Sequence, residues 1–318
     1  MTKELAPVVL FVYNRSVHTG KTLEALAENP DAERSVLYIY ADGPKPGISQ
    51  AGLENIGRVR ELIRSRKWCG EVKVIERDRN LGLASSVISG VTEVIGRHGK
   101  AIVLEDDIVT SSYFLRFMNG ALDGYESDKR IMSIGAYNYP KKLLKMPVDY
   151  RHDLFLSHRN TSWGWATWKD RWEMVDWELK DRRIILNDNE AKARLNRGGD
   201  DLFDMLKDQL TGKIDSWAIR FCYAHSVNGK YALLPVRSLV NNIGSDGTGT
   251  HRGNNAERIT EEGKDNLDRF ELEEGLLPDE KVIKAYRYAV NRLTGNDPWN
   301  RTIRSAKSAV RRLIRVNK

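Results

Sequence analysis

The first third of the chain alternates short apolar runs with stretches in which apolar residues recur at helical spacing. The apolar runs are typical of strands buried on both faces, and they lie at residues 8–13, 35–40, 72–75 and 101–104. Helical spacing fills the intervals, at residues 19–28, 52–66 and 83–94. This βαβαβαβ order predicts an α/β fold in which a mainly parallel central sheet is flanked by helices through right-handed crossovers.

Polar side chains follow each of the four predicted strands. They are Asn14-Arg15, Asp42-Gly43, residues 77–80 and Glu105-Asp106-Asp107. The carboxyl ends of parallel strands meet at one edge of a sheet, and ligands of such sheets bind beyond that edge. We therefore expect the four clusters to form one site.

Beyond residue 107 the pattern becomes mixed. It predicts strands at 131–137 and 154–157, helices at 112–125, 190–212 and 216–228, a Gly-, Ser- and Thr-rich loop at 241–255, and a helical region from about residue 280. We divide the chain into a nucleotide-sugar-binding half at 1–115, an acceptor-binding and catalytic half at 116–260, and a basic helical extension at 261–318.

Composition narrows the class of protein. Hydrophobic residues make up 41% of the chain and charged residues 30%, as in an ordinary soluble globular protein. No apolar stretch approaches the roughly 18 residues of a membrane span, and the N-terminus lacks the pattern of a signal peptide. The two cysteines, Cys69 and Cys222, have no metal-type spacing. Isolated thiols suit a reducing compartment, so we expect a cytoplasmic protein.

The net charge of +7 is concentrated at the C-terminus, where residues 298–318 contain seven basic residues and no acid. The remainder is nearly balanced, which argues against a nucleic-acid partner. Apolar residues at helical spacing in this tail predict an amphipathic helix. It would lie peripherally on an anionic membrane surface or pack on the protein, and the remaining alternative is a frayed tail.

The triplet Glu105-Asp106-Asp107 directly follows the fourth predicted strand. Adjacent carboxylates at the end of a buried strand are costly unless a cation compensates them. Mg²⁺ or Mn²⁺ is the usual cation, since it binds carboxylates together with substrate phosphates. The alternative is a solvated turn, which the position after a buried strand makes the weaker interpretation.

Other candidates have plain alternatives. Asp42 could accept a hydrogen bond from a nucleotide base, but Asp-Gly-Pro is also a common turn. Arg79 precedes a helix start that suits an anion or a base edge, or it is a surface charge. Asp215 could be a general base or an N-cap. His251, in the predicted loop, is a further candidate metal ligand, although a lone loop histidine is more often not one.

Tryptophans cluster between residues 163 and 177. Aromatic faces pack on the apolar faces of sugars, but a helix with this many tryptophans must bury most of them. Only Trp163 and Trp165, beside the Gly164 turn, are candidate substrate contacts.

The order of these motifs resembles glycosyltransferases of the GT-A, or nucleotide-diphospho-sugar transferase, fold. Residues 11–15, Asp42-Gly43, residues 79–82 and residues 104–107 resemble the family-2 group. The Glu-Asp-Asp form, Gly164-Trp165 and Asp215-Ser216-Trp217 followed by a loop near His251 resemble N-acetylglucosaminyltransferase I. The similarity covers roughly residues 7–255.

The resemblance implies a role for each matching residue. Asp107 would bind the metal, and Asp215 would be the general base. The nucleotide-sugar would be held by Asn14, Arg15, Asp42, Arg79, Glu105, Asp106 and Ser245, the last in a loop that closes over the diphosphate.

We therefore expect a hexosyl- or N-acetylhexosaminyl-transferase of inverting mechanism, using a UDP-sugar and Mn²⁺ or Mg²⁺. Its acceptor would be a surface glycan or glycolipid. A nucleotidylyltransferase should carry a glycine-rich basic loop after the first strand, which Asn14-Arg15-Ser16 does not provide. A glycan-binding module without turnover is the non-enzyme alternative, and Asp107 and Asp215 argue against it.

Overall fold

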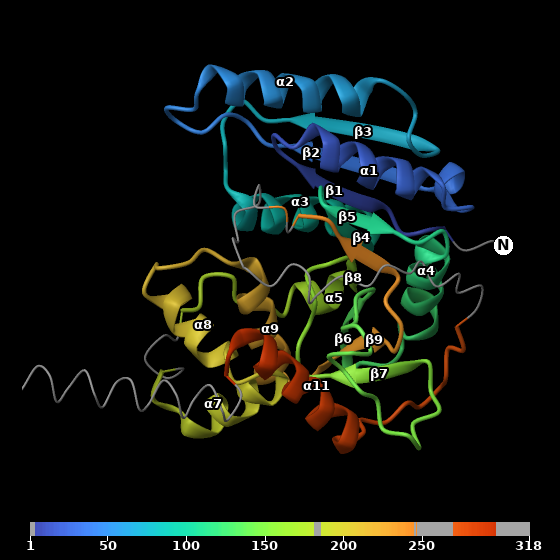
Figure 1. The fold of residues 1–318 in the computed structure, drawn as a ribbon, viewed down its shortest axis with the longest axis vertical. Coiled ribbons are helices and arrows are strands. Elements are labelled where there is room, and N and C mark those ends of the chain that lie inside the picture. Colours follow the sequence, from blue (N-terminus) through green and yellow to red (C-terminus); the bar gives the residue numbers. More distant parts are fainter. Residues whose placement is uncertain (1–3, 181–185, 245, 247–269, 297–318) are drawn as a thin grey trace, which may run out of the picture.

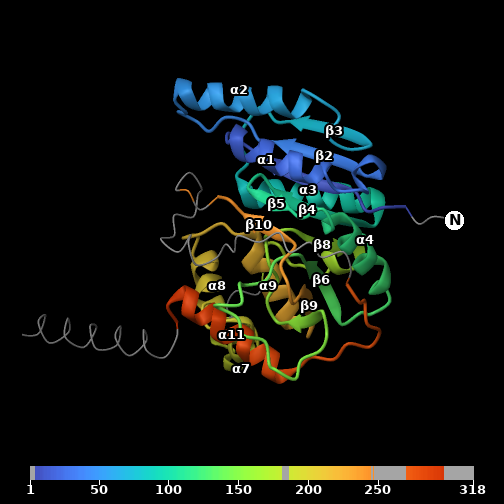
Figure 2. The same ribbon diagram turned by 45° about the vertical axis from the view of Figure 1, so that its right-hand side comes forward.

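The fold is organised around one eight-stranded mixed sheet with helices on both faces, as the computed structural model shows (Figures 1 and 2). The structure describes residues 4–180, 186–244, 246 and 270–296. The strand order is β3-β2-β1-β4-β8-β6-β9-β7. The predicted α/β class, with helices flanking a mainly parallel sheet, is confirmed.

The N-terminal half of the sheet is wholly parallel. Its strands are β1 (Val8–Val12), β2 (Val36–Ala41), β3 (Glu71–Glu76) and β4 (Lys100–Glu105). Its helices are α1 (Ser16–Ala27), α2 (Gln50–Arg64) and α3 (Leu83–His98), with a 3-10 turn η1 (Ala32–Arg34) after α1.

Alternate residues of each strand serve two separate cores. Leu10 of β1 packs in the cluster that holds α1 and α2 residues, whereas its neighbour Phe11 packs with the apolar face of α3. This two-sided burial explains why the strands are continuous apolar runs.

The second half of the sheet mixes directions. β8 (Trp165–Trp168) runs antiparallel to both β4 and β6 (Ile131–Gly135), β9 (Tyr231–Pro235) is parallel to β6, and β7 (Leu154–Ser157) is antiparallel to β9. A separate ribbon pairs β5 (Ile108–Thr110) with β10 (Val240–Asn242). The helices are α4 (Phe114–Gly124), α5 (Lys169–Trp172), α7 (Asn189–Leu195), α8 (Leu202–Leu210), α9 (Trp217–Val227) and α11 (Glu280–Thr294), with a 3-10 turn η2 (Asn196–Gly198).

Two sequence-based expectations differ from the structure. The helix predicted at 190–212 is divided into α7, η2 and α8, because Gly199 has a φ of 146°, which a helix does not contain. The aromatic segment supplies strand β8, which the pattern did not predict. The boundary proposed at residue 115 stays a prediction, and the sheet continues across it.

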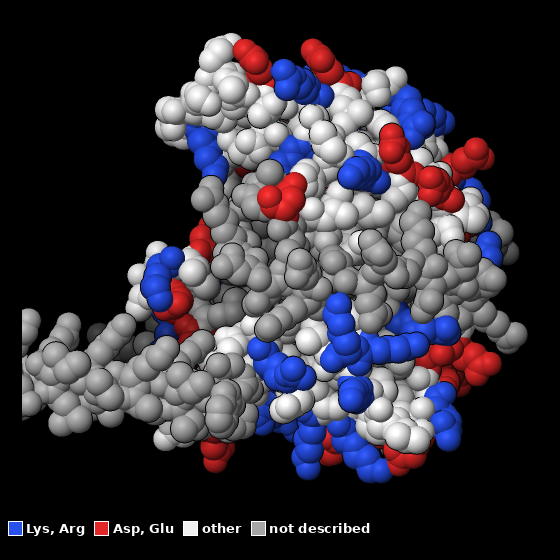
Figure 3. All heavy atoms as spheres, in the orientation of Figure 1, with Lys and Arg blue, Asp and Glu red and all other residues white. Residues whose placement is uncertain are grey.

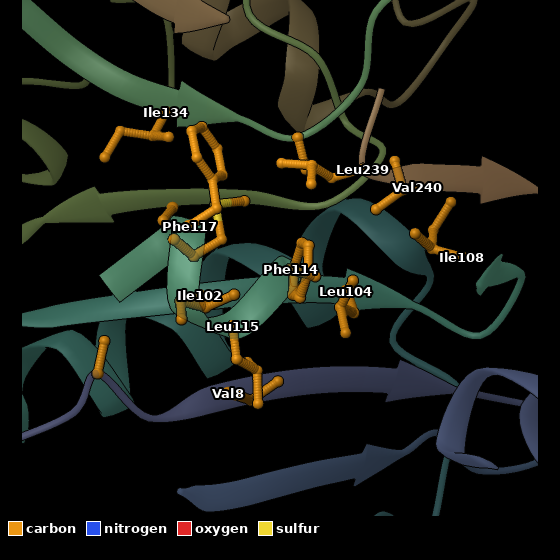
Figure 4. Close-up of a cluster of buried hydrophobic side chains, with 14 of the residues drawn as sticks. Val8, Ile102, Leu104, Ile108, Phe114, Leu115, Phe117, Ile134, Leu239 and Val240 are labelled. Carbon is orange, nitrogen blue, oxygen red and sulfur yellow. The ribbon is translucent and has the colours of Figure 1, made fainter. Parts of the chain in front are cut away.

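Helix α4 packs against both the β5–β10 ribbon and the eight-stranded sheet. Its Phe114 and Phe117 lie among side chains from β4, β5, β6 and β10 (Figure 4). Burying such a side chain contributes about 1.5–3 kcal/mol. This packing holds two segments next to Asp107 against the sheet. One is the start of β5, which follows Asp107 in the chain, and the other is the end of β10.

Helix α11 covers the second half of the sheet through Val282, Tyr286 and Val290. Arg287 Nε donates to Asp200 Oδ1 at 2.9 Å, which ties the helix to the start of α8. A helical element after residue 280 was expected. Among the described helices, none has the length and apolar character needed to cross a membrane.

Candidate functional site

The acidic triplet lies where the sheet changes from parallel to antiparallel. Glu105 ends β4, next to β1, and Asp106-Asp107 form the turn into β5. Asp106 is 6% exposed and Asp107 is 8% exposed, so the carboxylates are withdrawn from bulk water. The solvated-turn interpretation therefore does not apply.

Arg15 joins the end of β1 to this triplet. Its Nε donates to Asp106 Oδ2 at 3.2 Å, and its Nη2 donates to Asp107 Oδ2 at 2.9 Å and also pairs with Asp106 Oδ1. Thr22 of α1 donates to the Asp106 carbonyl at 2.9 Å. The hydrogen bonds with Asp106 and the nearby carboxylates raise the pKa of Arg15 despite its burial. Two of the predicted strand-end clusters thus meet.

The triplet is short of positive charge. Burial raises the pKa of Glu105 to about 8, assisted by Asp107 and Asp106 and opposed by Arg15 and by a hydrogen bond from Trp217. Burial also raises the pKa of Asp106 to about 6, although its hydrogen bond with Arg15 opposes the shift. One guanidinium is therefore insufficient for three carboxylates, and a divalent cation would complete the balance.

Asp107 retains an open ligand position. Its Oδ1 is buried and has no hydrogen-bond partner among the described residues. Its backbone oxygen accepts from Ile243 N at 2.9 Å, so the chain after β10 lies directly upon it. A Cβ on Gly244 would sit 2.1 Å from Asp107 Oδ2 and 3.1 Å from Arg15 Nη1. The backbone can approach this closely only because residue 244 is glycine.

These features fit a hard divalent cation whose remaining ligands come from a substrate. The described residues contain no cluster of three or more His, Cys, Asp or Glu that could hold a metal by themselves. Mg²⁺ and Mn²⁺ are often bound by one or two carboxylates plus phosphate oxygens. The buried, unpartnered Asp107 Oδ1 supplies such a carboxylate oxygen.

Asp42 organises the neighbouring loop. Its Oδ1 accepts from Leu81 N at 3.0 Å and from Gly43 N at 3.1 Å, and Asn80 Nδ2 donates to Gly43 O at 3.0 Å. These contacts tie the end of β2 to the turn before α3. Two more strand-end clusters are thereby joined, and the Asp-Gly turn is part of that junction. Arg79 is exposed at this turn.

The start of α9 adds a catalytic candidate near Glu105. Trp217, the first residue of α9, acts to lower the pKa of the Glu105 carboxyl, against the larger effect of burial. Ser216 is the N-cap and accepts from Ile219 N, so the capping interpretation of Asp215 is wrong. Asp215 is instead 59% exposed and accepts from Arg220 Nη2 at 2.7 Å. Its carboxylate is therefore available to a ligand.

The two candidate tryptophans have different environments. Trp165 is 1% exposed and stacks on Trp217 at 4.7 Å and on Trp172 at 5.7 Å. It offers no free ring face, so the structure contradicts its interpretation as a substrate contact. Trp163 is half-buried and meets Tyr137 edge to face at 4.3 Å. Trp163 stays a candidate contact.

Three neighbours of the site were not chosen from the sequence: Gly244, Trp217 and His18. His18 Nε2 lies 3.1 Å from Asp246 Oδ2, which links the segment after β10 to α1. For His18 the sequence signal was its position three residues after Arg15, on the first turn of a helix, and Trp217 was part of the Asp215-Ser216-Trp217 motif. Asn14 is half-buried beside Arg15. Ser245 and His251 lie outside the described residues, and so does the basic tail from residue 297.

Comparisons with known proteins identify similar folds but no family. No protein-family model matches the chain, and no curated protein does. Similar solved structures include S. aureus TarS 1-349, at TM-score 0.39 and 11% identity over 74% of this chain and 59% of that one. A Pyrobaculum calidifontis mannosyltransferase in complex with GDP-Man and Mn²⁺ gives 0.33 and 10% over 54% and 48%. The galactosyltransferase LgtC, with donor and acceptor sugar analogues, gives 0.33 and 10% over 56% and 64%.

This chain spans less than two thirds of each of these three proteins. Two of the three are named as glycosyltransferases, one a mannosyltransferase and one a galactosyltransferase, but all three TM-scores are below 0.5. The similarities therefore carry no argument about function, which rests on the site itself.

Proposed function

We propose that this protein is a metal-dependent, inverting glycosyltransferase of the GT-A type that moves a hexosyl or N-acetylhexosaminyl group from a UDP-sugar to a glycan hydroxyl. One observation carries the proposal. Asp107, in a buried acidic triplet at the carboxyl edge of the sheet, keeps an unpartnered Oδ1 beside a single neutralising arginine. Such an arrangement suits a cation held between carboxylate and diphosphate.

On the donor side, Asp107 would hold Mn²⁺ or Mg²⁺, which would neutralise charge on the departing nucleoside diphosphate. Arg15 and Asn14, at the end of β1, would bind the nucleotide. Glu105 and Asp106 would contact the ribose or the sugar.

Asp42 and the turn before α3 that it contacts would border the nucleotide base. The Asp42 carboxylate already accepts backbone hydrogens from Gly43 and Leu81, so it would act by a remaining lone pair and by fixing the loop that carries Arg79. Ser245 would close over the diphosphate, and His251 stays a proposed further ligand. Both lie outside the described residues.

On the acceptor side, inversion requires a carboxylate that takes the proton of the attacking hydroxyl. Asp215 is the candidate, because it is exposed and lies two residues before α9, whose first residue, Trp217, acts on the pKa of Glu105. Arg220 fixes its orientation. Trp163 would then offer a partly exposed ring to the acceptor sugar.

The proposed acceptor class rests on the distribution of basic residues. Lys and Arg side chains gather on the lower part of the face in Figure 3, where Figure 1 places α11. Together with the seven basic residues of 298–318, this supports an acceptor at an anionic surface. We propose a surface glycan, lipid-linked or free, and a cytoplasmic protein held peripherally at the membrane through the helix that the sequence predicts in the basic tail.

A donor-hydrolysis assay tests the proposal. The full chain is incubated with UDP- and GDP-sugars in Mn²⁺, Mg²⁺ or EDTA, and release of the nucleoside diphosphate is measured. We expect slow, cation-dependent release from a UDP-sugar that Asp107→Asn abolishes. Binding of glycans without any release would support the glycan-binding alternative, and pyrophosphate-dependent formation of UTP would support a nucleotidylyltransferase.

A further inference from the structure

Arg15 occupies an oxygen of the carboxylate that the proposed function assigns to the cation. Its Nη2 lies 2.9 Å from Asp107 Oδ2, and its Nε lies 3.2 Å from Asp106 Oδ2. A guanidinium and a divalent cation compete for the same carboxylate oxygens and repel each other at this range. In the geometry seen here, Arg15 is itself the counter-ion of the triplet.

The same cluster contains one buried acceptor atom and one buried donor atom that lack a hydrogen-bond partner among the described residues. The acceptor is Asp107 Oδ1 and the donor is Arg15 Nη1. The Gly244 backbone borders both residues, since its Cβ position is 2.1 Å from Asp107 Oδ2 and 3.1 Å from Arg15 Nη1. One atom can bind a cation and the other a phosphate oxygen, so the pair is complementary to a metal–diphosphate complex.

We propose that Arg15 changes partners when the donor binds. Without the donor it holds Asp106 and Asp107 and keeps a divalent cation bound only weakly. The diphosphate then draws the guanidinium away from Asp107, because phosphate oxygens accept from Arg in a bidentate manner. Asp107 is thereby released to the cation. This exchange rests on the proposed function and adds to it an order: the cation binds tightly only together with the diphosphate.

The exchange differs from two simpler roles. If Arg15 were only a nucleotide ligand, its removal would weaken UDP binding and leave the affinity for cation alone unchanged. If it acted only as a positive charge near the site, Arg15→Lys would behave like the wild type towards the cation. In the exchange, Arg15→Lys must bind the cation more tightly, since an ammonium cannot bridge the two carboxylates as a guanidinium fork does.

The test is a titration of the full chain with Mn²⁺ alone, followed by the EPR signal of free Mn²⁺, and repeated with saturating UDP. For Mn²⁺ alone we expect Arg15→Lys to bind at least about threefold more tightly and Arg15→Met at least about tenfold more tightly than wild type, within the usual range of coupling between sites. Both variants should lose affinity for UDP. The matched control is Arg64→Lys, because Arg64, the last residue of α2, forms a surface ion pair with Glu76 of β3.

Coupling between two ligands is reciprocal, so the factor by which UDP tightens Mn²⁺ must equal the factor by which Mn²⁺ tightens UDP. Part of that factor survives in both variants, since the phosphates themselves ligate the metal. The exchange predicts a smaller factor in each variant than in wild type.

The partner exchange of Arg15 and the proposed function can be refuted separately. If wild type binds Mn²⁺ and UDP together, but Arg15→Lys binds Mn²⁺ alone no more tightly than wild type, the exchange is wrong and the function stands, whatever Arg15→Met does. If wild type binds no UDP at any Mn²⁺ concentration, the proposed function is wrong, and the exchange falls with it. Should Arg15→Met fail to fold, Arg15→Lys, which keeps the charge, decides the question.

Discussion

Gly244→Ala tests the contact between the chain after β10 and the acidic triplet. The new Cβ would lie 2.1 Å from Asp107 Oδ2, whereas ordinary contact begins at 3.4 Å. Either the backbone at residues 243–244 or the Asp107 carboxylate must therefore move by about 1 Å or more. The carboxylate is the softer of the two, although its 2.9 Å bond to Arg15 opposes the movement.

The expected cost can be worked from these contacts. Overpacking a well-packed site costs about 1–3 kcal/mol of unfolding free energy, which is a modest loss for a chain of this size. Function should fall much further, since a misplacement of about 1 Å in a reacting constellation costs on the order of 10²-fold in rate. We therefore expect a folded protein that binds Mn²⁺ and UDP poorly and releases UDP about 10²-fold more slowly.

Urea denaturation and the donor-hydrolysis assay measure the two effects. The control is Gly96→Ala, on the exposed side of α3, where an added Cβ meets nothing within 4 Å. Removing a glycine from a helix interior should stabilise the protein by about 0.5–1 kcal/mol and leave turnover unchanged. Wild-type turnover and metal binding in Gly244→Ala would refute the placement of this backbone against Asp107.

Three further predictions follow from the described contacts. Asp215→Asn should lower sugar transfer by about 10²–10⁴-fold without weakening UDP binding, and near-normal transfer would remove Asp215 from the mechanism. Trp165→Ala should cost about 3–5 kcal/mol in urea denaturation, whereas Trp163→Ala should raise the acceptor KM at nearly unchanged stability. Burial lowers the pKa of His225 to about 4, so the folded state binds fewer protons than the unfolded state between about pH 6.5 and 4. Stability from His225 is present above pH 6.5 and is lost as the pH falls to 4. His225→Gln should flatten this acid loss, which is about 3 kcal/mol at most, and an unchanged pH slope would contradict it.

The parallel half was predictable from the chain because each of its strands is buried on both faces. Runs such as residues 8–13 and 101–104 have no other simple interpretation, and their polar ends meet in space, as Arg15 and Asp106 do. The burial of Asp106 and Asp107 follows from their position directly after such a run.

The rest depends on contacts between distant segments. β10 pairs with β5, and Asn242 therefore lies opposite Ile108. No local pattern in the sequence predicts that pairing. The placement of Gly244 on Asp107 follows from it and was therefore invisible in the sequence. Trp165 was misjudged because a four-residue strand shows too little alternation to distinguish a buried ring from an exposed one.

Thermal denaturation of the full chain with nucleoside diphosphates and Mn²⁺ tests the central claim most directly. We predict that UDP with Mn²⁺ raises Tm by several degrees, since ligand at about 100 times its Kd adds about 2.7 kcal/mol. UDP in EDTA should give a much smaller shift, and Asp107→Asn should remove the Mn²⁺-dependent part. A Tm that no nucleoside diphosphate changes with either Mn²⁺ or Mg²⁺ would contradict a nucleotide-sugar site at Glu105-Asp106-Asp107.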